Sequence, residues 1–344
     1  MTPRWYPTSV TRLVPLGPEP QPTRRLPRSE WATGDVVVGI VTLDAPRPSL
    51  LESPSGRMVG VGPGDEVVGA LGARAATLEA VGDWRDVGDE LRFDALTSAG
   101  VFGRCTSRAV TLQPLVPLVY GGHVLLEGEP VRLRDFVPPA PPDAGPFELP
   151  TVLLIGTSMD AGKTVAARTI IRRLTRHGLR VAGAKLAGVG RLRDVLRMQD
   201  AGADVIFDFV DAGLPSTICP QPEFEAALRP LLARIGASGA DVLVAEAGAS
   251  PLEPYNGETV LRELRRSLRL VVLCASDPYA VVGVMQAFEL RPDLVSGRAT
   301  STEAGIALVE RLSGVRALNM LEPATEAPLD ALLEERLGLT ASVA

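Results

Sequence analysis

Nine consecutive residues carry the clearest chemical signal in this chain. The segment GTSMDAGKT (156–164) combines two glycines, a lysine and a threonine in a spacing that suits phosphate binding. Backbone N–H groups over 158–164 can surround phosphate oxygens, and Lys163 adds a positive charge for the terminal phosphates. The Thr164 hydroxyl can coordinate the Mg²⁺ ion that accompanies a nucleoside triphosphate. The segment therefore predicts a phosphate loop that binds a nucleotide.

The sequence around this loop supports the prediction. An apolar run, TVLLIG (151–156), precedes it, and a segment with apolar residues at helical spacing (162–178) follows, so the loop joins a strand to a helix. It is one residue longer than the common GxxxxGK[ST] pattern. A strand–turn–helix corner that carries Gly-Lys-Thr by chance is the alternative, and the flanking pattern disfavours it. The expected nucleotide contacts are Gly156, Thr157, Ser158, Asp160, Ala161, Gly162, Lys163 and Thr164.

Strand-like and helix-like segments alternate from 151 to 340. Apolar runs at 179–188, 240–248 and 268–276 are separated by stretches with helical spacing. This rhythm predicts an α/β fold, a mainly parallel, doubly wound P-loop NTPase sheet with ligands beyond the carboxyl ends of its strands. Shorter strands are expected at 205–210, 293–297 and 315–321, and helices near 190–201, 223–236, 257–267, 279–288, 302–312 and 326–337.

The N-terminal half has a different rhythm. Residues 1–34 are rich in Pro and Arg and predict an arm with little regular structure, part of which can dock as an extended strand. Short apolar runs split by Gly and Pro over 35–136 predict a β-rich domain, either a barrel or a sandwich. His123 is the only histidine in this domain and is expected to be structural. Six prolines in 137–150 predict a semi-rigid linker before the P-loop domain at 151–340.

Composition excludes several classes of partner. The net charge of −6 argues against a general nucleic-acid binder, because phosphate backbones require a basic surface. The chain has no long apolar run and no signal-peptide pattern, so we expect no membrane association and a cytoplasmic location. The three cysteines are far apart, which predicts free thiols rather than disulfides or a zinc site.

The long phosphate loop resembles the GTxxxxGKT loop of dethiobiotin synthetase and its relatives. These relatives include the cobyrinic-acid diamide synthases and belong to the SIMIBI class of P-loop proteins. Lys185, near the end of RVAGAKLAG (180–188), is similar to the lysine that ends the family's second strand and faces the phosphates and substrate. Lys163 and Lys185 are the only lysines in the chain, and both fall on this pattern. A P-loop family known only as a domain of unknown function is similar in its loop and in its Glu-containing strand.

The resemblance continues in the strand segment DVLVAEAGAS (241–250). It is similar to the family's apolar strand ending in Glu-Gly-Ala-Gly, whose glutamate holds magnesium, and Glu246 matches that glutamate. Ala247 and Ser250 stand where the family has glycines, so the following loop departs from the family's shape. The resemblance covers about half of the chain.

The resemblance also implies a metal site and a base-binding region. The family has an acidic residue after the second strand; Asp200 and Asp204 both lie in range, and we prefer Asp200. The implied Mg²⁺ ligands are therefore Thr164, Asp200 and Glu246. The loop that contains Arg298 lies near the base in the dethiobiotin synthetase family, so Arg298 is expected to contact the nucleobase. No NKxD guanine-reading motif occurs, which favours ATP over GTP.

Two further segments should lie at the same edge of the sheet. Asp277 precedes Pro278 and is expected to cap the following helix rather than to bind substrate. The segment PLEPYNGET (251–259) either shapes a substrate pocket or a subunit contact, or is an ordinary surface loop.

Three functions are compatible with these residues. The first is an ATP- and Mg²⁺-dependent enzyme in which Lys163 and Lys185 stabilise phosphoryl transfer to a small acceptor, a carboxylate or carbamate. The second is a nucleotide-driven switch or ATPase that acts on a protein or cofactor partner through the N-terminal β domain. The third is a nucleotide-sensing module with little turnover. A homodimer is expected from the resemblance to SIMIBI proteins.

Overall fold

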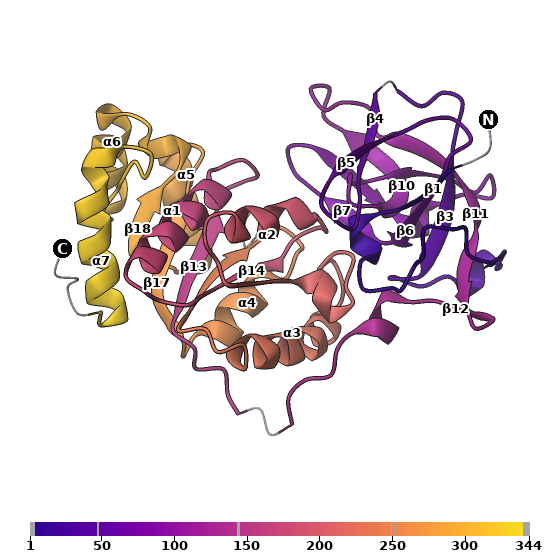
Figure 1. Ribbon diagram of the computed structural model, residues 1–344. Coiled ribbons are helices and arrows are strands. Elements are labelled where there is room, and N and C mark those ends of the chain that lie inside the picture. The colour runs from indigo at the N-terminus through magenta and orange to yellow at the C-terminus, as the bar shows by residue number, and fades with distance from the viewer. Residues whose placement is uncertain (1–3, 47, 143–144, 249, 251, 340–344) are drawn as a thin grey trace. The chain divides into compact units, whose positions relative to one another are not determined.

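The computed structural model describes residues 4–339 except 47, 143–144, 249 and 251 (Figure 1). Residues 1–3 of the predicted arm, 143–144 of the predicted linker and residue 340 of the predicted P-loop domain lie outside the described residues. The chain separates into two compact units. The first consists of Met1–Pro139, Val189–Arg193 and Phe209–Ala227, and the second of Ala140–Gly188, Asp194–Asp208 and Leu228–Ala344. Two short segments of the C-terminal half therefore belong to the first unit.

The first unit contains a closed β-barrel. Its five strands pair in a ring, because β10 pairs with β9 and also with β6. The β6–β10 pairing is parallel, and the other four are antiparallel. Ring closure pairs the strand edges with one another, so we identify the predicted β-rich domain as a barrel. In ring order the strands are β6 (Glu66–Leu71), β3 (Val36–Val41), β11 (Val116–Leu126), β9 (Arg92–Ala95) and β10 (Val101–Arg108). The remaining strands of this unit are β1 (Trp5–Pro7), β2 (Thr23–Arg24), β4 (Ser49–Glu52), β5 (Met58–Val61), β7 (Ala73–Ala75), β8 (Ala80–Asp83) and β12 (Glu129–Pro130).

Alternate residues of the barrel strands form its apolar core. Val37 and Val41 of β3 are four residues apart, as are Val67 and Leu71 of β6, and an even spacing places each pair on one face of its strand. Gly69 lies between the latter two, and a Cβ there would stand 2.5 Å from the ring of Phe102. Glycine at this position therefore lets the Phe102 ring approach the β6 backbone. The core consists of Trp31, Val37, Val41, Leu51, Val61, Val67, Leu71, Val87, Phe93, Ala95, Phe102, Val116, Leu118 and Tyr120.

The proline-rich N-terminal segment docks on this barrel. β1 pairs in parallel with β6, and a 3₁₀ turn (Ser9–Thr11) follows it. Val10 and Trp31 are only 1% and 5% exposed, and the Trp31 ring lies 4.5 Å from that of Tyr120. The prolines exclude a helix here, but they leave apolar side chains that the barrel buries. Part of the segment thus docks as an extended strand, as predicted.

A buried polar network fixes the same region of the barrel. The imidazole of His123, which is fully buried, lies 2.6 Å from the Tyr120 hydroxyl and 3.0 Å from a carboxylate oxygen of Asp35. Arg132 donates to the other oxygen of Asp35 at 2.9 Å. Each group has a hydrogen-bond partner, and His123, Tyr120 and Asp35 are buried, which supports the structural role predicted for His123.

The second unit contains a six-stranded parallel sheet. All neighbouring strands pair in parallel. Most strand residues are buried, as expected for a sheet covered on both faces. This arrangement confirms the predicted α/β fold. In spatial order the strands are β15 (Val205–Asp208), β14 (Val181–Ala187), β16 (Val242–Ala247), β13 (Thr151–Gly156), β17 (Leu268–Cys274) and β18 (Leu294–Ser296).

Helices connect these strands (Figure 1). Right-handed crossovers place α1 and α2 on one face of the sheet and α3 and α4 on the other, because the two pairs connect strands that advance in opposite directions. Arg173 of α1 donates to Asp330 of α7 at 2.6 Å, which ties α7 to α1. The helices are α1 (Lys163–Arg176), α2 (Leu192–Gln199), α3 (Gln221–Gly236), α4 (Gly257–Leu264), α5 (Pro278–Phe288), α6 (Glu303–Ser313) and α7 (Glu326–Leu337).

One of the predicted strands of the sheet does not form. Residues 315–321 form only a single bridge, between Ala317 and Val295, because β18 is short and offers them little edge to pair with. In the β-rich domain, residues 75–81 contain a turn between β7 and β8. Among the described residues, no helix is long and apolar enough to cross a membrane.

Candidate functional site

The phosphate loop leaves the carboxyl end of β13 and enters α1 at Lys163. Gly162 immediately before the helix has φ 110° and ψ 7°, a left-handed conformation that a residue with a Cβ adopts only under strain. Asp160 is also left-handed, with φ 54°, and its side chain is exposed. The first N–H groups of α1 have no partner within the helix, so they form a ready site for an anion.

Thr157, the residue that stands in place of the usual first glycine, anchors the loop to β17. Its N–H donates to the carbonyl of Cys274 at 3.0 Å. Its hydroxyl accepts from the N–H of Ser276 at 3.0 Å and lies 3.1 Å from the Ser276 hydroxyl. Threonine can make these side-chain contacts and glycine cannot, so the variant residue fixes the start of the longer loop.

The segment after β18 packs directly against the loop. A Cβ on Gly297 would stand 2.1 Å from the carbonyl oxygen of Ala161, so only glycine fits there. The N–H of Arg298 points to the same oxygen at 3.4 Å. The Arg298 side chain is exposed. The structure thus brings Arg298 beside the phosphate loop, while its contact with a nucleobase stays a prediction.

Lys163 is buried among acidic groups at this edge. Its ammonium donates to the carbonyl of Ser158 at 3.0 Å and is only slightly exposed. Burial lowers the pKa of Lys163, and the nearby carboxylates of Glu246 and Glu253 oppose that change. An anionic ligand would supply the negative charge that favours the protonated lysine.

Glu246 ends a buried strand beside this lysine. The pKa of Glu246 is raised to about 7, mainly by burial and secondarily by the charge of Asp194, while Lys163, Lys185 and a hydrogen bond from Thr164 limit the increase. Its Oε1 atom has no hydrogen-bond partner among the described residues. A buried carboxylate oxygen without a partner is costly unless a ligand or ion meets it.

These groups fit a Mg²⁺ ion. Mg²⁺ prefers oxygen ligands and is usually held by one or two carboxylates together with substrate phosphates. The Thr164 hydroxyl and the unpartnered Glu246 oxygen provide such donors at one place. The described part of the chain contains no cluster of three or more His, Cys, Asp or Glu that could hold a metal ion without further ligands.

Lys185 lies between two carboxylates across the strand ends. It is in register with Asp208 of β15 on one side and with Glu246 of β16 on the other. Its ammonium also pairs with Asp194 of α2 at 2.6 Å. Lys185 and Glu246, both predicted site residues, therefore lie side by side, and both are mostly buried.

Asp200 does not take the place that the sequence predicts for it. It follows the last residue of α2 and is exposed. The alternative, Asp204, accepts from the N–H of Val181 at the amino end of β14, away from the site. The acidic groups near Glu246 and Lys185 are instead Asp194, in the first turn of α2, and Asp208, at the end of β15. Asp194 also lies after the second strand of this domain, β14, but it is closer to that strand than Asp200, the residue preferred from the family resemblance.

The structure also places Asp277 and most of the segment 251–259, although residue 251 lies outside the described residues. Asp277 accepts from the N–H of Tyr279 at 2.8 Å, which confirms its capping role at α5. In the segment after β16, Tyr255 is buried whereas Glu258 is exposed. Glu253 is buried too, and its charge acts on Lys163, so this part of the segment contributes to the site's electrostatics.

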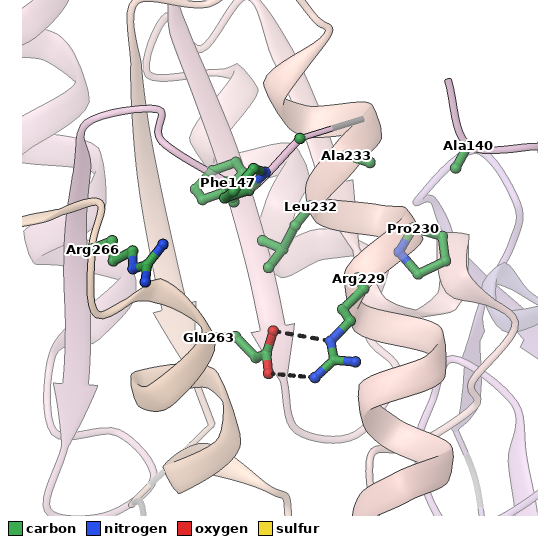
Figure 2. A pocket seen from close by; sticks show the side chains of 10 residues that line it. Ala140, Phe147, Arg229, Pro230, Leu232, Ala233, Glu263 and Arg266 are labelled. Carbon is green, nitrogen blue, oxygen red and sulfur yellow. Dashed lines mark hydrogen bonds and ion pairs between the residues drawn. The ribbon is translucent and has the colours of Figure 1, made fainter. Parts of the chain in front are cut away.

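A cavity of about 510 Å³ lies elsewhere in the second unit (Figure 2). The linker residues Ala140 and Phe147 line it together with α3, and the bidentate pair Arg229–Glu263 joins α3 to α4 at 3.2 Å for both contacts. Phe147 comes just before β13 and the lining residue Arg266 just before β17, so the cavity faces the amino ends of the strands. Phosphate-loop residues do not line it. We therefore place the candidate site at the carboxyl ends.

Comparison with known proteins gives distant similarity only. No protein-family model matches the chain, and no curated protein matches it. Hydrogenase maturation factor HypB from Archaeoglobus fulgidus is 16% identical with a TM-score of 0.35, over 55% of this chain and 90% of that one. A DUF1611 family protein from Anabaena variabilis is 17% identical with a TM-score of 0.34, over 58% and 63%. The signal recognition particle 54 kDa protein from Aeropyrum pernix, solved in complex with GDP, is 18% identical with a TM-score of 0.33, over 58% and 51%. The chain spans less than two thirds of the latter two proteins, and scores this low support no conclusion about activity.

Proposed function

We propose that this protein is a Mg²⁺-dependent nucleoside triphosphatase whose nucleotide state is transmitted to the N-terminal β unit. One observation carries the proposal. The helix that starts at Lys163 and Thr164 meets a buried Glu246 whose Oε1 has no described partner, and Thr164 donates to this glutamate. A lysine, a hydroxyl and an unpartnered carboxylate at a helix N-terminus are the groups that phosphate and Mg²⁺ require together.

Different residues of the site would bind the phosphates, hold the metal ion and stabilise the charge that develops during phosphoryl transfer. Lys163 and the N–H groups at the start of α1 would bind the phosphates. Thr164 and Glu246 would hold Mg²⁺, which when bound supplies positive charge against the developing negative charge of the transferred group. Lys185 lies across the strand ends from Glu246, where a second positive charge can stabilise the same group. The chemistry depends on positioning, so it needs no histidine base.

The make-up of the two units favours the coupling part of the proposal. The segments Val189–Arg193 and Phe209–Ala227 belong to the first unit. In the sequence they directly follow the carboxyl ends of β14 and β15, which carry Lys185 and Asp208. A change at these strand ends would therefore reach residues held by the first unit within a few peptide bonds, as a nucleotide-driven switch requires.

Phosphoryl transfer to a small carboxylate or carbamate is the second candidate. The position of Lys185 favours it, because a buried ammonium beside a phosphate site can also hold an anionic acceptor. We favour ATP as the donor on the sequence grounds given above, and GTP is the alternative that a direct comparison must address.

Formation of the nucleoside diphosphate by the full-length chain tests both candidates, because hydrolysis and transfer to an acceptor both release it. ATP and GTP are supplied with Mg²⁺, first alone and then with a panel of small carboxylic acids in bicarbonate buffer. Turnover without an added acid supports the nucleoside triphosphatase, and turnover only with one acid supports the acceptor enzyme. Thr164→Val should abolish the Mg²⁺-dependent rate, whereas Thr169→Val, on the same helix, should leave it unchanged. Failure of the wild-type protein to bind either nucleotide would overturn both candidates.

A further inference from the structure

Glu52 is a buried carboxylate that no step above uses. It ends β4 in the first unit and is completely buried. It accepts the N–H of Leu192 on one oxygen and that of Arg193 on the other, each at 2.9 Å. The hydroxyl of Ser9 donates to it as well. Hydrogen bonds from several donors offset the cost of burying a carboxylate, and here two of the donors are the first N–H groups of α2.

The segment that Glu52 holds is fixed from a second side. Val189 bridges to Ser216, and the N–H of Gly190 donates to the carbonyl of Pro215 at 3.0 Å. A Cβ on Gly190 would meet the Pro215 oxygen at 3.0 Å and a methyl group of Val10 at 3.4 Å. All of these residues belong to the first unit. Residues 189–193 are therefore held by that unit, although in the sequence they lie between β14 and the remainder of α2, which belong to the second unit.

The next residue along the chain is Asp194, which pairs with Lys185 at 2.6 Å. Each contact lies within one unit, and the Arg193–Asp194 peptide bond joins them. Asp194 is in the first turn of α2, so its direction depends on how residues 192 and 193 are held. In this position the Asp194 carboxylate holds the Lys185 ammonium in an ion pair.

From this arrangement we infer that Glu52 is a positioning residue of the nucleotide site. It fixes the first turn of α2 and so holds Asp194 against Lys185, which gives the β unit control over the second lysine of the site. The inference rests on the proposed nucleotide function. The Lys185–Asp194 ion pair would be the connection through which the first unit and the site affect each other.

The test measures kcat and KM for Mg²⁺-dependent hydrolysis of the preferred nucleotide by the full-length protein. Titration of the same proteins with Mg²⁺ and the nucleoside diphosphate gives a Kd that does not depend on turnover. Glu52→Gln keeps the shape of the side chain but turns an NH₂ group toward one of the two N–H donors. We expect kcat/KM and the affinity to change by about tenfold. Glu129→Gln is the matched control, because it removes the same charge in the same unit from a side chain that is 84% exposed, and it should change neither.

A double-mutant cycle separates positioning from a general loss of stability. If Glu52 acts through Asp194, Glu52→Gln should have less than about a twofold effect in a protein that already carries Asp194→Asn. Equal effects in both backgrounds would overturn the inference. If Glu52→Gln does not fold, Ser9→Ala removes a single donor to Glu52 and should give about a threefold change with the same dependence on Asp194. A wild-type protein that hydrolyses nucleotide, together with Glu52→Gln and Ser9→Ala variants equal to the control, would refute this inference and leave the proposed function intact.

Discussion

Gly297→Ala, a substitution in the segment after β18, should displace the phosphate loop that packs against it. Gly297 has φ 96° and ψ −155°, a region that essentially only glycine occupies, so alanine costs about 1–3 kcal/mol in backbone strain. The added Cβ would also stand 2.1 Å from the carbonyl oxygen of Ala161, whereas real contacts are almost never shorter than 3.0 Å. Relief of the clash therefore requires a movement of about 1 Å between the two segments.

Ala161 lies two residues before Lys163, the first residue of α1. A movement of Ala161 therefore displaces the N–H groups at the start of α1 that would bind phosphate. A displacement of about 1 Å can cost on the order of 100-fold in a site that depends on positioning. We expect nucleotide affinity, measured by titration with a fluorescent nucleotide, to fall by at least tenfold while circular dichroism shows an intact fold.

Gly283→Ala is the matched control for this substitution. Gly283 lies within α5, and a Cβ there would meet no heavy atom within 4 Å. Alanine should therefore leave the affinity unchanged and stabilise the helix by about 1 kcal/mol at most. If Gly297→Ala binds nucleotide as tightly as Gly283→Ala and the wild type, then the segment after β18 does not support the phosphate loop, and the reasoning about the site's geometry fails.

Two further substitutions test the electrostatics of the second unit. Burial raises the pKa of Glu246 from its ordinary value of 4.5 to about 7, so the folded nucleotide-free protein binds this proton more tightly than the unfolded chain, and stability falls as the pH rises through that interval. Glu246→Gln should therefore change the free energy of unfolding little near the lower value and raise it by at most about 3 kcal/mol above the higher one; urea denaturation in EDTA measures this, and a difference that does not grow with pH would contradict it. Arg173→Ala removes the bidentate contact with Asp330 that holds α7 and should lower the free energy of unfolding by about 1 kcal/mol. Arg176→Ala, whose side chain is 66% exposed, should have a smaller effect, and equal effects of the two would indicate that the Asp330 contact does not stabilise α7.

Site residues that belong to one continuous segment of the chain could be predicted from the sequence. Lys163 and Thr164 are recognisable because a strand, a glycine-rich loop and a helix follow one another without interruption. Lys185 and Glu246 end apolar runs, and the carboxyl ends of parallel strands meet at one edge, so their proximity could be expected. The helix at 326–337 was predicted with the bounds that the structure gives it.

What the sequence could not predict depends on pairing between distant segments. Asp208 belongs to the site because β15 is in register beside β14, and register cannot be read from either strand alone. Asp194 was missed because its position depends on α2, whose first turn is held by Glu52 about 140 residues earlier in the chain. The barrel closes through parallel pairing of β6 with β10, and the sequence of neither strand indicates which strand it pairs with.

The central claim is that Lys163 binds the phosphates of a nucleotide together with Mg²⁺. Calorimetric titration of the full-length protein with ATP and with GTP, in Mg²⁺ and in EDTA, tests it most directly. The wild type should bind at least one of them more tightly with Mg²⁺, and Lys163→Ala should weaken that binding by about two orders of magnitude, whereas Arg176→Ala on the same helix should not. Equal affinity of Lys163→Ala and the wild type, or no binding by the wild type, would contradict the account.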